Sequence, residues 1–222
     1  MILSPLLKAL ANVVQKTRNS AQINQETGVS VRLGIHGLEL LVGEAERTRA
    51  LHYKILSVPR ISDMHSLKQV IKFELSELDD TVKNREKVFD ELLKESVKET
   101  CLEYLDGLDK TILESIKEEI GENTFQVSQN LIWKNGQASY SNQLENFSNL
   151  RNLVESKLNL IKSSQKDLKH QVEHLKIDTK SLELSEQQEN ELRSTLLEII
   201  LEALCWTNPK ILDKTEVGYG KA

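Results

Sequence analysis

The stretch that decides the fold is FSNLRNLVESKLNLIKSSQKDLKHQVEHLKIDTKSL, residues 147–182. Its side chains can be followed along one seam by alternating steps of four and three residues. Eight of the eleven seam positions are apolar: Phe147, Arg151, Val154, Leu158, Ile161, Gln165, Leu168, Val172, Leu175, Thr179 and Leu182. A seam of this spacing and length is typical of a coiled coil, in which a helix buries one narrow stripe against a partner helix.

Residues 64–120 are the expected partner of that helix. They contain no proline and one glycine, Gly107, and their apolar stripe changes phase midway, which indicates a stutter or bend in one long helix. The two helices are joined through 121–141, so the pair predicts an antiparallel hairpin. The predicted fold class is therefore all-α, an elongated helical bundle built on a long antiparallel coiled-coil hairpin.

Three regions follow from this prediction. Residues 1–60 are expected to form an N-terminal helical region, 61–184 the hairpin with its tip at 121–141, and 185–222 a C-terminal helix with a flexible tail. A capping box at Ser185 and Gln188 begins that last helix. Glycines at 34, 37 and 43 indicate close helix contact, and a strand over 29–35 stays open as an alternative to helix.

The first helix presents the clearest amphipathic face. Apolar residues recur at three- and four-residue steps from Leu3 to Val14, opposite Lys8, Asn12 and Lys16. Packing on the same chain is the first interpretation of this stripe, and docking on a protein partner or on a membrane are the alternatives. Aromatic residues at the hairpin tip are further contact candidates. The predicted partner-binding residues are Leu3, Leu6, Leu7, Leu10, Trp133 and Tyr140.

Charge is unevenly distributed along the chain. The net charge is −5, but residues 1–60 carry eight Lys and Arg against four Asp and Glu. This basic region makes a peripheral anionic-membrane or nucleic-acid-binding module the main alternative function. Its cations are scattered rather than clustered, so neither kind of partner is favoured. Two widely separated cysteines and no apolar run long enough to span a membrane predict a soluble protein, cytoplasmic or otherwise intracellular.

The segment HQVEH, residues 170–174, matches the H-x-x-E-H pattern of a class of zinc proteases. The seam residue Val172 sets the phase of the helix and points both histidines away from the seam, whereas a catalytic zinc needs a concave site and a third ligand. A metal-dependent helical enzyme at His170 and His174 is therefore the least favoured alternative. No catalytic residue, metal ligand or cofactor is predicted.

The expected function is that of a non-enzymatic structural, adaptor or assembly protein. A long, narrow helical protein offers much surface and little enclosed volume, which suits the binding of other proteins through helix faces and coiled-coil surfaces. Self-association stays open, because the seam can pair within one chain or between two copies. No small-molecule substrate is evident from any motif.

Overall fold

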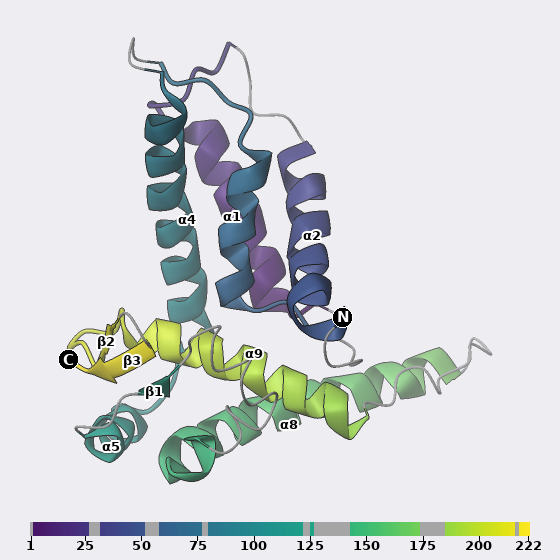
Figure 1. Ribbon diagram of the computed structural model, residues 1–222. Coiled ribbons are helices and arrows are strands. Elements are labelled where there is room, and N and C mark those ends of the chain that lie inside the picture. Colours follow the sequence, from purple (N-terminus) through teal and green to yellow (C-terminus); the bar gives the residue numbers. More distant parts are fainter. Residues whose placement is uncertain are drawn as a thin grey trace. The chain divides into compact units, whose positions relative to one another are not determined.

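The computed structural model divides the chain into two units, Met1–Asp106 and Gly107–Ala222 (Figure 1). It describes residues 2–26, 32–51, 58–76, 80–121, 125–126, 143–173, 185–215 and 218–222, without the side chains of residues 50 and 165–173. Helices make up most of the described residues, and three short strands form the rest of the regular structure. The all-α part of the predicted fold class is confirmed at this level.

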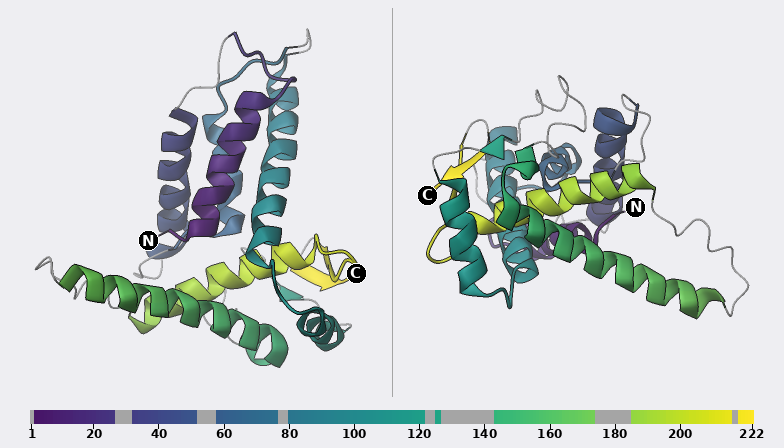
Figure 2. Two further views of the ribbon diagram at one scale, coloured as in Figure 1. Left: turned by 180° about the vertical axis from the view of Figure 1, so that it is seen from behind. Right: turned by 90° about the horizontal axis from the view of Figure 1, so that it is seen from below.

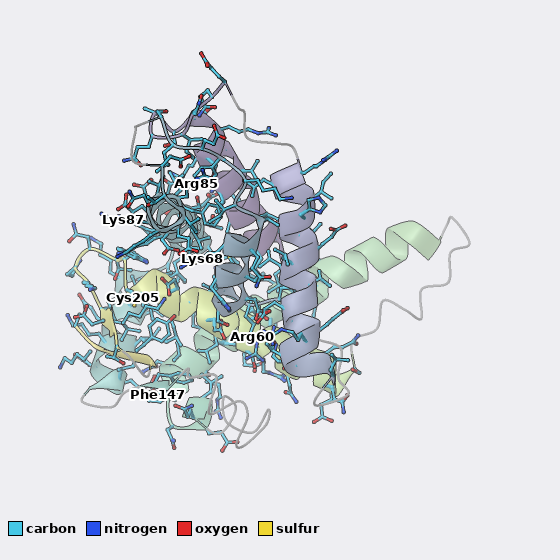
Figure 3. All side chains as sticks on the ribbon, turned by 45° about the horizontal axis from the view of Figure 1, so that its top comes forward. Arg60, Lys68, Arg85, Lys87, Phe147 and Cys205 are labelled. Carbon is cyan, nitrogen blue, oxygen red and sulfur yellow. The ribbon has the colours of Figure 1, made fainter. Side chains whose placement is uncertain are left out.

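The first unit is built from three α-helices and two shorter helical segments. The α-helices are α1 (Ser4–Asn19), α2 (Arg32–Ala45) and α4 (Val82–Tyr104), and both α2 and α4 pack on α1 (Figure 2, left). A π-helical turn, η1 (Glu46–Ala50), follows α2 directly. A 3-10 helix, η2 (Ile61–Val70), packs on α2 and α4, and Arg60 and Lys68, labelled in Figure 3, lie near its two ends.

A buried ion pair joins the end of α2 and η1 to η2. Arg49 donates to both carboxylate oxygens of Asp63, at 3.0 and 2.6 Å, and to the carbonyl oxygen of Val58 at 2.9 Å. The backbone N–H of Arg60 donates to the same carboxylate at 2.7 Å. Arg49 and Asp63 are each 3% exposed, so this network lies inside the unit. Hydrogen bonds of this kind are what allow opposite charges to be buried.

Residues 61–76 are not the start of a long helix. After η2 the chain is extended, and it pairs with the loop after α1: the N–H of Asn24 donates to Glu74 O at 2.8 Å, and that of Ser76 to Gln22 O at 2.9 Å. Asp80 then accepts hydrogen bonds from the backbone N–H of Leu75 at 3.2 Å and from Arg85 Nε at 2.5 Å. Arg85 thus pairs with a residue close to it in the sequence.

The first arm of the predicted hairpin also ends early. Helix α4 stops at Tyr104, and α5 (Lys110–Ile120) begins after a turn in which Gly107 has a φ of +79°. That left-handed conformation suits glycine and interrupts the helix. The predicted change of phase, between Leu92 and Val97, instead falls inside the continuous helix α4. The long coiled-coil hairpin is not confirmed.

The second unit contains α5, α8 (Ser148–Glu173) and α9 (Glu186–Leu204). Helix α8 packs on both α5 and α9. Glu119 of α5 accepts hydrogen bonds from Ser148 Oγ at 2.7 Å and from the N–H groups of Asn149 and Leu150, at 2.9 and 3.1 Å. A carboxylate from a neighbouring helix thus satisfies N–H groups that the first turn of α8 leaves without intrahelical partners.

The buried face of α8 is wider than the predicted seam. Phe147, Val154 and Leu158 are buried as the seam requires, but Leu150 and Leu153 are also buried. One narrow stripe predicts one partner helix, whereas this broader face serves two, α5 and α9. Arg193 Nε of α9 adds an ion pair with Glu155 at 2.5 Å, and Lys162 pairs with Glu189 at 2.6 Å.

Two strands near the C-terminus form a small antiparallel sheet with a third strand from earlier in the chain. Strand β3 (Gly218–Lys221) lies between β1 (Phe125–Gln126) and β2 (Leu212–Lys214). Tyr219 of β3 donates to Glu202 of α9 at 2.9 Å, and Lys214 Nζ lies 2.9 Å from the same oxygen. The buried side chain of Leu212 and this hydrogen bond from Tyr219 keep the end of the chain in place.

The unit boundary at 106 and 107 differs from the predicted regions. Residues 1–60 do not stand apart, because α1 packs along α4 and η2 packs on α2. Residues 29–35 were open to either strand or helix, and the described residues among them, 32–35, are helical and belong to α2. The predicted hairpin tip lies almost entirely outside the described residues.

Candidate functional site

The side chains of helix α1 lie in three different environments. Its core side, including Leu6, Ala9 and Val13, is buried. A polar edge runs along α4, where Lys8 pairs with Glu103, and Lys16 with Glu99 at 2.8 Å. The third edge carries Leu7, Ala11 and Val14. Leu7 is 43% exposed, so this apolar edge is not covered to the same extent as the core side.

Helix α2 is placed beside that third edge by a glycine. A methyl group added at Gly37 would lie 2.9 Å from Leu10 Cδ1 and 3.1 Å from Leu67 Cδ2, which leaves no room for any other residue without movement. The predicted close helix contact is confirmed at this position. A methyl group at Gly34 would meet Val14 Cγ2 at an ordinary 3.6 Å, and Gly43 has nothing within 4 Å.

A groove of about 470 Å³ follows the line where α1 and α2 meet. Its apolar wall and floor are formed by Leu7, Leu10, Ala11, Val14, Gly34 and Ile35. Gln15, Arg18 and Asn19 line its polar end. Ile35 is 56% exposed, so the groove is bounded on both sides by accessible aliphatic side chains. We refer to this surface as the α1–α2 groove.

The predicted partner-binding residues do not all reach this groove. Leu7 and Leu10 line it, while Leu3 and Leu6 are buried in the first unit. Trp133 and Tyr140 lie outside the described residues. Ile35 was not among the predicted contact residues, although α2 is apolar on more than one side, with Leu33 and Leu41 buried and Ile35 exposed.

The cations of the first unit are largely balanced by acidic residues of the same unit. Residues 1–106 contain fifteen Lys and Arg against sixteen Asp and Glu, so the positive charge of 1–60 is offset within one packed unit. Lys16 is held between Glu99 and Glu95, and these neighbours raise its pKa above 10.5, Glu99 most strongly. Among the described residues, no ion pair involves Arg18 at the end of the groove.

The cysteines and histidines do not form a reactive site in the described part of the chain. Cys101 and Cys205 are buried thiols that are not part of a disulfide, and burial raises the pKa of the Cys205 thiol to about 12. A thiol of such high pKa stays protonated at neutral pH and is a poor nucleophile. No group of three His, Cys, Asp or Glu side chains in the described residues is placed to hold a metal ion.

The histidines of the zinc-like motif cannot be placed by their side chains. His170 belongs to α8 but its side chain is not among those described, and His174 lies outside the described residues. None of the described helices combines the length and apolar character that crossing a membrane would require.

The α1–α2 groove is thus the described surface that combines a hollow, accessible aliphatic side chains and a basic end. The chain matches no protein-family model, no curated protein and no solved structure.

Proposed function

We propose that this protein is a non-enzymatic adaptor that binds an amphipathic helix of another protein in the α1–α2 groove. The observation that carries the proposal is the pair of accessible aliphatic side chains, Leu7 and Ile35, on the two sides of one groove. A groove between two antiparallel helices accepts a third helix through residues spaced three, four and seven apart.

The charge at one end of the groove defines the partner further. Lys8 and Lys16 are occupied by glutamates of α4, whereas Arg18 lines the polar end together with Gln15 and Asn19. A partner with an acidic residue at that end would form a charge-assisted hydrogen bond with the guanidinium group. The expected partner is therefore a helix with an aliphatic stripe and one acidic end.

The nucleic-acid and membrane alternative receives less support. Its basis was the positive charge of residues 1–60, and that charge is offset by residues 61–106 of the same unit, which contain twelve Asp and Glu against seven Lys and Arg. Binding to a nucleic acid depends on clustered cations of the protein that release the counterions of the polyanion.

Pairing between the coiled-coil seams of two copies is the other alternative. Phe147, Val154 and Leu158, in the first half of the seam over 147–182, are already buried within the chain. A second copy could therefore pair only with the second half of the seam.

The test measures binding of two fluorescent helical peptides by anisotropy. Both have leucines at positions i, i+4 and i+7; one carries glutamates near one end and the other carries lysines there. We expect the acidic peptide to bind more tightly, and Ile35→Asp to weaken it by about tenfold or more. Arg18→Gln should reduce the difference between the peptides, as should added salt.

Val82→Asp is the matched control. Val82 is 70% exposed in the same unit but lies outside the groove, so the same change of charge and size there should leave peptide affinity unchanged. Circular dichroism checks that each variant keeps its helices. Equal loss of affinity in Ile35→Asp and Val82→Asp, or no binding of either peptide, would reject the proposed groove.

A further inference from the structure

A second hollow lies on the other side of α2, between that helix and the end of η2. Helix α2 and η2 lie side by side in the first unit (Figure 1). The cleft between them has a volume of about 490 Å³, which is within the range of small-molecule sites in proteins. It shares no lining residue with the α1–α2 groove. We refer to it as the α2–η2 cleft.

The interior of this cleft is apolar and firmly held. Leu33, Leu40, Val70 and Phe73 line it, and Phe73 is only 2% exposed. The Phe73 ring packs on that of Phe89 in α4, with ring centroids 6.4 Å apart. The extended backbone beside Phe73 is pinned by the hydrogen bond between Asn24 N and Glu74 O, so the apolar surface is formed before any ligand arrives.

The rim of the cleft carries more cations than anions. Arg32 and Lys72 supply two positive charges, and Glu39 supplies one negative charge. Glu39 is already engaged, because its Oε2 lies 3.0 Å from Nδ1 of His36. An apolar body would therefore enter the interior while an anionic group would meet the ammonium group of Lys72 at the rim.

We propose that the α2–η2 cleft binds a small carboxylic acid with an apolar body, on the order of ten to twenty non-hydrogen atoms in size. The apolar body contacts Leu40 and Val70, which lie over the buried Leu33 and Phe73, and the carboxylate accepts a hydrogen bond from Lys72. This site does not depend on the proposed adaptor function, since it uses a different side of α2. No sequence motif indicated it, because its residues come from two separate segments.

Titration calorimetry with decanoate, below the concentration at which it self-associates, tests this site. We expect one decanoate per chain, and no matching binding of decyltrimethylammonium, which has an alkyl tail one carbon longer and the opposite charge. Lys72→Glu should weaken decanoate binding by about tenfold, since it replaces an attractive charge by a repulsive one. Lys87→Glu, on the exposed side of α4, is the matched control and should change it little.

Filling the cleft provides a second, independent variant. Leu40→Trp should block decanoate while leaving peptide binding in the α1–α2 groove intact, which separates failure of this site from failure of the adaptor proposal. If Leu40→Trp unfolds the protein, the comparison of Lys72→Glu with Lys87→Glu still tests whether decanoate binds in the α2–η2 cleft. Equal binding of both detergents, equal effects of the two lysine variants, or no binding of decanoate would overturn the proposal.

Discussion

Gly37 faces Leu10 so closely that a methyl group on its α-carbon would lie 2.9 Å from the Cδ1 atom of that leucine. This contact sets the spacing of α1 and α2, and hence the shape of the groove between them. Gly43, in the same helix, has nothing within 4 Å. The two glycines therefore form a matched pair for substitution, because Gly37 lies against a neighbouring helix and Gly43 does not.

Gly37→Ala is expected to raise the free energy of unfolding less than Gly43→Ala does, because the added methyl group must displace the terminal methyl groups of Leu10 and Leu67, which offsets the gain in helix propensity. Gly43→Ala should raise it by about 0.5–1 kcal/mol, since alanine is the better helix former and meets nothing there. Urea denaturation followed by circular dichroism measures both. Equal stabilisation by the two changes would mean that α2 does not approach α1 as closely as described.

The buried pair of Arg49 and Asp63 should be much more sensitive than an exposed pair. Asp63→Ala leaves a guanidinium group buried without its carboxylate, so we expect a loss of about 3–5 kcal/mol in the free energy of unfolding. Asp90→Ala removes the carboxylate that Lys68 Nζ meets at 2.8 Å near the surface, and should cost about 0–1 kcal/mol. Similar losses in both variants would contradict the burial of the first pair.

The carboxyl group of Asp80 should titrate below its usual range. Its pKa is lowered from 3.8 chiefly by the hydrogen bond from Arg85, with a smaller contribution from the backbone N–H of Leu75. A carboxyl group whose pKa is depressed by folding stabilises the protein at neutral pH, and that contribution is lost as the pH falls below 3.8 through the folded-state value. NMR titration of the side-chain carboxyl carbon should show Arg85→Gln returning the pKa toward 3.8, and an unchanged pKa would rule out this pairing.

The C-terminal strand should lose stability in alkaline solution. Burial raises the pKa of Cys205 from 9.0 to about 12, and burial followed by the charge of Glu202 raises that of Tyr219 above 10. The unfolded chain releases both protons at lower pH than the folded chain, so the free energy of unfolding should fall as pH rises above 9. Under reducing conditions, Cys205→Ala should make the free energy of unfolding fall less steeply between pH 9 and 12. If the pH dependence were unchanged by this substitution, the thiol would not be buried.

Glu119 should stabilise α8 from outside that helix. Glu119→Gln keeps the size of the side chain but removes the charge that meets Ser148 and two backbone N–H groups. We expect a loss of about 1 kcal/mol in the free energy of unfolding, comparable to that of a lost helix cap. Glu118→Gln, an exposed neighbour, is the control and should have almost no effect.

Local patterns were enough to predict several elements of this fold. The spacing of apolar residues indicated the helix that became α8, and the capping box at Ser185 was confirmed at the start of α9, with Gln188 N donating to Ser185 Oγ at 3.3 Å. Such features depend on residues within one or two turns of each other. They can therefore be read without knowing which elements pack together.

The partners of each helix could not be read in this way. The apolar stripes before and after 121–141 looked complementary, yet α4 packs on α1, where Thr100 accepts a hydrogen bond from Asn12 at 3.2 Å. Ser96 and Thr100 are buried because their hydroxyls donate to carbonyl oxygens one turn earlier, so a polar sequence position became part of the packed face. Glu119 likewise caps a helix that begins about thirty residues later.

The candidate site was only partly visible for the same reason. The stripe from Leu3 to Leu10 identified the correct helix, but its core side and its groove side differ only in what packs against them. To predict that Leu6 is buried and Leu7 lines the groove, one must know that α4 packs along the polar edge of α1 and that α2 approaches α1 at Gly37. Ile35 became a candidate only when its neighbours left it exposed.

Methyl NMR of the full chain, titrated with the acidic helical peptide, locates the binding surface without any mutation. Binding in the α1–α2 groove predicts that the methyl signals of Leu7, Val14 and Ile35 shift together and saturate at one peptide per chain. The methyl signals of Val82 and Leu160, which are exposed elsewhere, should stay in place. Shifts at those two residues with no change at Leu7 and Ile35 would contradict the groove as the partner-binding site.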